Sequence, residues 1–203
     1  MQSVEDKVIS RIYGRGRGSV WTPADFGDFG GRDAVDAALS RHARQERIRR
    51  IARGLYHYPE KHPLLGEVAP SIDNIAKALA GRDHSRLLPS GAYAANLLRL
   101  SDQIPARVVF LTDAWSRKVN VGALTIELRR VGPKRVAAAG RTSGLVIEAL
   151  RYLGKDHVSR KRLEPLLELL SENDQRQLAE DIRLAPEWMQ GYLKYIAGEK
   201  EEG

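Results

Sequence analysis

The chain has 203 residues, of which 33 are lysine or arginine and 26 are aspartate or glutamate, so its formal net charge is +7. This length suffices for one large domain or two small ones with a buried hydrophobic core. The absence of cysteine excludes disulfide scaffolds, thiolate zinc sites, iron–sulfur clusters and cysteine nucleophiles. The positive charge is compatible with an anionic partner but does not establish one.

Targeting and membrane signals are missing from the sequence. No apolar run reaches the roughly 18 residues that a membrane-spanning helix needs. Residues 1–14 lack the basic start and the continuous apolar segment of a signal peptide. We therefore expect a cytoplasmic protein that makes no contact with a membrane.

The first 62 residues follow a recognisable order of elements. In chain order the patterns predict a helix over 3–13, an extended segment at 20–21, a short helix beginning at Pro23, a helix over 32–46, and a β-hairpin of 48–51 and 55–58 around a turn at 52–54. This order is typical of a winged helix-turn-helix, whose second motif helix enters the major groove of DNA. We therefore expect residues 1–62 to form a winged helix-turn-helix DNA-binding domain.

The helical phase of residues 32–46 separates a buried face from an exposed one. At 100° per residue, the apolar stripe contains Val35, Ala38, Leu39 and His42. His42 is thus expected to be a core histidine rather than a metal ligand. Ser40 and Arg44 lie on the opposite face, where they are suited to contact bases and phosphates.

Arginine is concentrated in this part of the chain. Between residues 32 and 53 all seven cations are arginine, against three acidic residues. Arginine matches phosphate and guanine bidentately, although a solvated basic face is the alternative interpretation. Arg53, at the hairpin turn, is the best single candidate for a phosphate or minor-groove contact. The full set of candidate DNA-binding residues is Arg15, Arg17, Arg32, Ser40, Arg41, Arg44, Arg47, Arg49, Arg50 and Arg53.

Residues 63–203 are expected to form a second, mixed α/β domain that ends in helices, so that the whole chain is α+β. Prolines at 59, 63 and 70 place the domain boundary near residue 62. The predicted elements are a helix from the Ser71 cap to 80, a helix over 91–100 capped by Ser90, a strand over 107–112, a hairpin of 118–121 and 124–131, and helices over 142–153, 159–171, 174–184 and 186–197. Ser143 and Gly144 are expected to belong to a helix cap.

No catalytic constellation emerges from the sequence. The histidines at 42, 57, 62, 84 and 157 lack the spacing of a zinc site. The segment from Gly14 to Gly18 alternates glycine and arginine but lacks the lysine and hydroxyl residue that end a phosphate-binding loop. We therefore expect no catalytic residues, no metal, no cofactor and no enzymatic activity.

Three strings together carry a family resemblance: RDAVDAALSRHARQERIRRIARGLYHYPEKHPLLGEVAPS at 32–71, PSGAYAANLLRLSDQIPARVVFLTD at 89–113, and RKVNVGALTIELRR at 117–130. They resemble the AbiEi antitoxins, in particular the short branch that pairs an N-terminal winged helix with a compact C-terminal domain. The resemblance covers roughly residues 3–155. One departure is Glu46, which stands where a recognition helix of this kind often ends in glycine.

The resemblance implies the antitoxin of a type IV toxin–antitoxin system. Such a protein binds inverted repeats in its own promoter as double-stranded DNA, with two copies per operator, and represses the operon. Its C-terminal domain, here 63–203, counters a cognate nucleotidyltransferase toxin of the AbiEii type. The family offers no catalytic motif to transfer to this chain.

A second interpretation is a protein-interaction module that captures or modifies the toxin directly, with DNA binding secondary. Two basic pairs, Arg129-Arg130 and Lys134-Arg135, are suited to an acidic partner or to the toxin's RNA substrate. An exposed hairpin rim explains the same pairs equally well.

Overall fold

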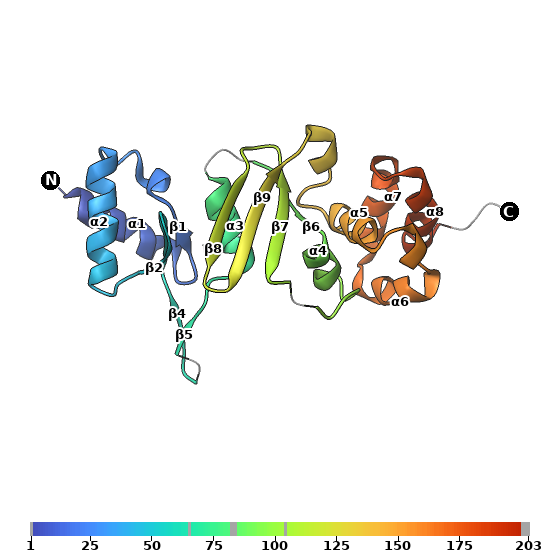
Figure 1. Ribbon diagram of the computed structural model, residues 1–203, viewed down its shortest axis with the longest axis horizontal. Helices are drawn as coiled ribbons and strands as arrows, with labels where there is room; N and C mark the ends of the chain where they lie inside the picture. The colour runs from blue at the N-terminus through green and yellow to red at the C-terminus, as the bar shows by residue number, and fades with distance from the viewer. Residues whose placement is uncertain (1, 65, 82–84, 104, 200–203) are drawn as a thin grey trace. The chain divides into compact units, whose positions relative to one another are not determined.

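The computed structural model describes residues 2–64, 66–81, 85–103 and 105–199. Its contacts divide the chain into two compact units: unit 1 comprises Met1–Ser85 and Val119–Ala123, and unit 2 comprises Arg86–Lys118 and Leu124–Gly203. The fold mixes helices and strands and has helices at both ends of the chain, in agreement with the α+β prediction (Figure 1). Within the described ranges no helix is long and apolar enough to cross a membrane.

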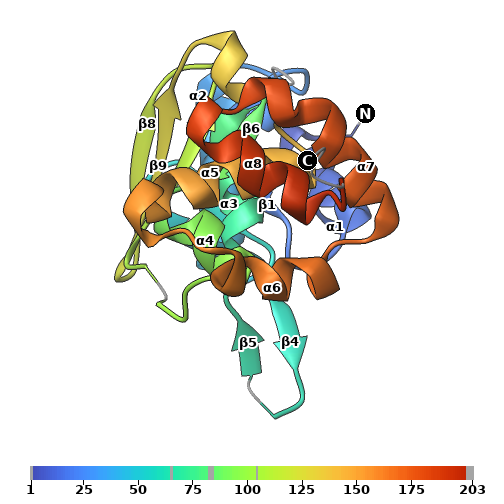
Figure 2. The same ribbon diagram turned by 90° about the vertical axis from the view of Figure 1, so that its right-hand side faces the viewer.

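Unit 1 continues past the boundary expected at residue 62. Its elements are α1 (Val4–Arg15), β1 (Val20–Trp21), the 3₁₀ helix η1 (Pro23–Phe26), α2 (Arg32–Arg44), β2 (Arg49–Ala52), β3 (Leu55–His57), β4 (Glu60–His62), β5 (Gly66–Val68) and α3 (Ile72–Ala80). The first three strands form an antiparallel sheet of order β1-β3-β2. Among the described strands, β4 and β5 pair only with each other (Figures 1 and 2). Their residues are exposed.

The core of unit 1 is built where the amphipathic faces of α1 and α2 meet η1 and the sheet. Its buried residues are Val8, Ile12, Trp21, Phe26, Val35, Ala38, Leu39, Ile48 and Tyr56. The rings of Trp21 and Phe26 pack against each other in a tilted arrangement, with centroids 5.2 Å apart. Burial of Val35, Ala38, Leu39 and His42 confirms the phase predicted for the second helix.

Local hydrogen bonds explain where α1 begins and where α2 ends. Ser3 caps α1 through a capping box, because its hydroxyl oxygen accepts from the Asp6 N–H at 3.1 Å and its own backbone N–H donates to the Asp6 carboxylate at 3.3 Å. Helix α2 ends at Arg44, two residues before the predicted end. There the Arg47 N–H reaches the His42 carbonyl at 3.1 Å, and Glu46 adopts a left-handed φ of 57°. This is a Schellman motif with glutamate in the glycine position.

Unit 2 combines a four-stranded sheet with a helical cluster. Its elements are β6 (Leu87–Ser90), α4 (Ala92–Leu97), β7 (Arg107–Thr112), the first two residues of β8 (Arg117–Val121), β9 (Leu124–Arg130), η2 (Pro133–Val136), α5 (Thr142–Leu153), η3 (Lys155–His157), α6 (Arg160–Leu169), α7 (Glu172–Asp181), η4 (Ile182–Leu184) and α8 (Glu187–Ile196). The sheet has the order β6-β7-β9-β8. Strand β7 runs antiparallel to β6 and parallel to β9, starting with Arg107 opposite Thr125.

Helices α4 to α8 lie close together (Figure 2) and enclose a hydrophobic core. Ala94 and Ala95 of α4 lie against α5, whose Val146, Ala149 and Leu150 are fully buried. The C-terminal helices contribute Leu163, Leu166, Leu178, Met189, Leu193 and Ile196. Each predicted helix after residue 140 is therefore confirmed, with its apolar stripe turned into this core.

Two serine predictions for unit 2 are wrong. Ser90 is the last residue of β6 instead of a helix cap, and its hydroxyl donates to Glu148 at 2.7 Å. The following helix, α4, has Gly91 as its N-cap and is shorter than predicted. Ser143 lies inside α5, whose N-cap is Arg141, and its hydroxyl donates to the buried carboxylate of Asp181.

Candidate nucleic-acid interface

The exposed face of α2 carries the arginines that the sequence singled out. Arg44 is exposed near the end of the helix, while Ser40 is half-buried one turn earlier. Arg32 is the first helical residue, and its side chain is 78% exposed beside Asp36 at 3.5 Å. The buried stripe fixes this orientation, since rotating α2 would expose four core residues.

A hollow of about 480 Å³ lies between α2 and β2. Helix α2 contributes Ser40, Ala43 and Arg44 to its lining, and β2 contributes Arg49 and Arg50. The structure thus brings four of the ten candidate residues together on one surface of unit 1. A shallow surface lined by hydroxyl and guanidinium groups presents donors to a phosphate or a base edge.

The β2–β3 hairpin presents a further cation at its tip. Ala52 pairs with Leu55, so Arg53 and Gly54 form a two-residue turn. Gly54 has a φ of 70°, a conformation that glycine adopts without steric cost. Arg53 is exposed on this turn, as predicted.

The candidate arginines differ in whether an acidic residue already holds them. Arg44, Arg47, Arg50 and Arg53 are exposed and form no ion pair or side-chain hydrogen bond with any residue that the structure describes. These four cations keep their full hydrogen-bonding capacity for a ligand. An unpaired guanidinium can bind a phosphate without first breaking an ion pair with a protein carboxylate.

Arg41 and Arg49, by contrast, are engaged within unit 1. Arg41 Nε donates to the Glu5 carboxylate on α1 at 2.7 Å. Arg49 binds Glu67 of β5 bidentately, with Nε and Nη2 at 2.9 and 3.1 Å from the two carboxylate oxygens. These hydrogen bonds lower the pKa of Glu67 and raise that of Arg49. Sequence patterns did not indicate Glu67, because it lies on the exposed β4–β5 hairpin, where we expected the domain boundary.

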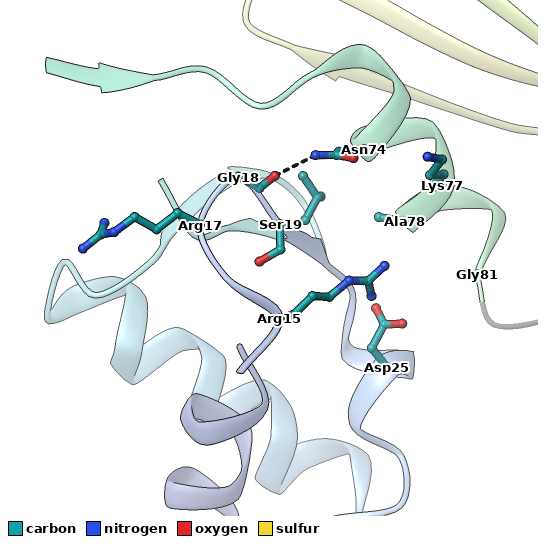
Figure 3. Close-up of a pocket in the computed structure, with 10 residues that line it drawn as sticks. Arg15, Arg17, Gly18, Ser19, Asp25, Asn74, Lys77, Ala78 and Gly81 are labelled. Atoms are coloured by element: carbon teal, nitrogen blue, oxygen red, sulfur yellow. Dashed lines mark hydrogen bonds between the residues drawn. The ribbon is translucent and has the colours of Figure 1, made fainter. Parts of the chain in front are cut away.

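Arg15 and Arg17 line a different pocket, of about 410 Å³, together with Asn74 and Lys77 of α3 (Figure 3). The Arg15 guanidinium points toward Asp25 and lies 5.0 Å from the centre of the Trp21 ring. Arg17 extends away from the pocket, donates to the Pro59 carbonyl at 2.9 Å and lies over the Tyr58 ring. The structure therefore separates these two arginines from the hollow beside α2.

Metal-binding groups do not gather anywhere in the described part of the chain, where no set of three histidine or acidic side chains could hold an ion. His42 and His57 are buried. His42 Nε2 lies 3.2 Å from the Glu5 carbonyl and links α2 to α1, which supports its role as a core residue. His62 and His157 are exposed, and His84 lies outside the described residues.

Comparison with protein-family models matches residues 7–178 to a family of unknown function, DUF6088. The chain belongs to the DUF6088 family. The DUF6088 match begins within α1 and ends within α7, so it includes both compact units. No curated protein matches the sequence.

The DUF6088 region contains every candidate DNA-binding residue from Arg15 to Arg53. It also contains Glu67 and the β4–β5 hairpin, while α8 lies beyond it. The arginine-lined hollow of unit 1 is therefore a feature within the family region rather than in an added segment.

Proposed function

We propose that unit 1 of this DUF6088 protein is a winged helix-turn-helix that binds double-stranded DNA. Helix α2 is the recognition helix, and the β2–β3 hairpin is the wing. One observation carries the proposal: the unpaired Arg44 and Arg50 border the same hollow, and the unpaired Arg53 occupies the adjoining hairpin turn. The order of α1, η1, α2 and the hairpin supports it, because helix-turn-helix proteins place the second motif helix in the major groove.

The biological role we propose is that of a type IV antitoxin and autorepressor, as the resemblance to AbiEi proteins implies. The protein binds inverted repeats in its own promoter, with two copies per site, and residues 63–203 counter a nucleotidyltransferase toxin. It acts in the cytoplasm, without enzymatic activity or cofactor. Toxin neutralisation without direct contact distinguishes this role from that of a module that captures the toxin.

A gel shift on the protein's own upstream DNA, beside random duplex of equal length, tests the DNA-binding proposal. Binding is expected to weaken steeply with salt, because each neutralised phosphate contributes about 0.9 to the slope of log K against log salt. Arg53→Ala should weaken binding to all sequences. Arg44→Ala should in addition lose discrimination at one base pair, by about 1–3 kcal/mol.

Arg183→Ala is the matched control. Arg183 is an exposed arginine of unit 2 that forms no ion pair or side-chain hydrogen bond with the described residues, so its removal changes the net charge equally. Equal losses for Arg183→Ala and Arg53→Ala would contradict a specific wing contact. Equal losses on operator and random DNA for Arg44→Ala would contradict the placement of α2 in the groove.

The antitoxin role is tested by co-expressing the chain with a nucleotidyltransferase toxin of the AbiEii type. Restored growth without co-elution of the two proteins on a sizing column is the expected result. Restored growth with stoichiometric co-elution would favour direct capture instead. Failure to restore growth, with promoter binding intact, would leave a DNA-binding regulator and refute the antitoxin role.

A further inference from the structure

Unit 2 displays one tryptophan almost entirely on its surface. Trp115 lies in the loop that joins β7 to β8 and is 72% exposed. The other two tryptophans differ: Trp21 is buried, and Trp188 packs partly against the helical core. A large aromatic side chain left in water offers a flat apolar surface that a ligand can cover.

The loop around Trp115 is held by hydrogen bonds on both sides. Before it, the Asp113 carboxylate accepts from the backbone N–H of Arg86 at 3.0 Å and from its Nε at 2.7 Å. After it, the Ser116 hydroxyl oxygen accepts from the Arg130 N–H at 3.0 Å. The indole is therefore presented by a fixed loop, which reduces the entropy lost when a ligand stacks on it.

Basic residues lie close to the exposed indole in space or in sequence. The Arg130 guanidinium lies 5.3 Å from the ring centre. Arg117 and Lys118 follow at the start of β8, and both are exposed. Together with Trp115 these three residues form what we name the Trp115 patch.

Nearby acidic groups are neutralised within unit 2. The Asp113 carboxylate is bound by Arg86 at 2.7 Å. Glu127 is bound by both Arg107 and Arg129. Among the residues that the structure describes, the carboxylates of Asp113 and Glu127 are thus bound by arginines outside the Trp115 patch, and the exposed Lys118 and Arg130 give the patch a positive charge beside the indole ring.

We propose that the Trp115 patch binds single-stranded nucleic acid, with one base stacked on the indole and the neighbouring phosphates held by Lys118 and Arg130. A positively charged surface that follows the backbone, combined with an aromatic platform, is the recognition mode of single-strand binding proteins. Bases in a duplex are already stacked, so a duplex cannot use the indole. An acidic polypeptide would use the cations but would leave the indole without a matching flat partner.

The test uses the full chain and its own tryptophan fluorescence. Oligo(U) and oligo(dT) of about 12 nucleotides, a length that covers a typical single-strand site, are titrated into the protein at low salt. Stacking on Trp115 should quench the exposed component of the emission. The same sequence annealed as a duplex should cause little quenching. Comparing the two oligomers shows whether the 2′-hydroxyl contributes to binding.

Variants assign the effect to the patch. Trp115→Ala should weaken oligonucleotide binding, followed by anisotropy, by about 5- to 140-fold, the range expected for one stacked base. Trp115→Phe should recover most of that loss, because it restores an aromatic face. Tyr152→Ala, at another exposed aromatic residue of unit 2, and Arg183→Ala are the controls and should change affinity little.

Three results would overturn the proposal. The first is the absence of quenching by single strands. The second is equal anisotropy titrations for the native protein and Trp115→Ala. The third is quenching by poly-glutamate as strong as that by the oligonucleotides, which would assign the patch to an acidic protein. Thermal melting of each variant shows whether a lost signal instead reflects loss of folding.

Discussion

The ion pair between Arg49 and Glu67 leads to a prediction that a simple count of charges does not make. Arg49 lines the hollow beside α2, but its guanidinium is turned to a carboxylate of the β4–β5 hairpin. Replacing that carboxylate by an amide of the same size, Glu67→Gln, removes the charge that holds Arg49 Nε at 2.9 Å and leaves Arg49 in place, beside Glu46 in a longer ion pair of 3.6 Å. We expect this variant to bind duplex DNA more tightly than the native protein.

The magnitude follows from one additional phosphate contact. A freed Arg49 adds about 0.9 to the slope of log K against log salt, so affinity should fall about 3.5-fold more than for the native protein between roughly 50 and 200 mM salt. Stability should change little, because the Arg49 and Glu67 side chains are 42% and 38% exposed and exposed ion pairs contribute little to folding.

Fluorescence anisotropy on upstream duplex at several salt concentrations measures this slope. Glu60→Gln is the matched control, since Glu60 lies on the same hairpin, is exposed and forms no ion pair with a described residue. The double variant Glu67→Gln with Arg49→Ala should return the slope to the native value. An equal rise for Glu60→Gln and Glu67→Gln would show that only net charge matters and would refute the release of Arg49.

Three further predictions concern the stability of unit 1. Leu39→Ala, at a fully buried core position, should lower the free energy of unfolding by about 2–5 kcal/mol in urea denaturation; a smaller loss would contradict close packing of α2. Glu46→Gly should raise the melting temperature slightly, because a left-handed conformation costs a non-glycine residue about 1–2 kcal/mol, partly offset by glycine's entropy. Burial lowers the pKa of His57, against an opposing effect of Glu67. The unfolded chain therefore binds a proton at His57 more readily than the folded chain does. The free energy of unfolding should keep its full value above pH about 6.5 and decrease as the pH falls below it. His57→Leu should make this decrease smaller.

Local patterns were sufficient for the elements whose determinants lie within one turn or one strand. Ser3 and Asp6 fix the start of α1 by a contact over three residues. The alternation of Leu124, Ile126 and Leu128 places β9 with one face buried. The phase of α2 likewise follows from its own apolar stripe. In each case the residues that decide the structure are close together in the sequence.

Strand β6 and the β4–β5 hairpin were missed, for two different reasons. Strand β6 contains Pro89 and ends at Ser90, a composition that suggests a turn, yet it forms a strand because it pairs with β7. It is an edge strand, where proline is tolerated. The β4–β5 hairpin has no buried face, so hydrophobic periodicity could not reveal it.

For the candidate site as well, the sequence predicted the local features but not those that depend on distant residues. The sequence located the arginines on α2 and the hairpin but could not sort them into paired and unpaired groups. Arg41 is held by Glu5, 36 residues earlier, and Arg49 by Glu67, 18 residues later. These partners decide which cations are available, and their positions depend on the packing of α1, β5 and β2, which no local pattern contains.

The two proposed nucleic-acid contacts depend on different interactions, so their salt dependence should distinguish them. Duplex binding by unit 1 depends on guanidinium–phosphate pairs such as those of Arg44 and Arg53, so it should weaken steeply as salt rises. Stacking on Trp115 involves an uncharged ring, and the part of the binding energy that it supplies should persist at higher salt. Raising the salt should therefore abolish duplex binding before it abolishes the quenching of Trp115 by single strands. If both signals vanished together, phosphate contacts alone would account for the binding to unit 2, and the indole would have no part in it.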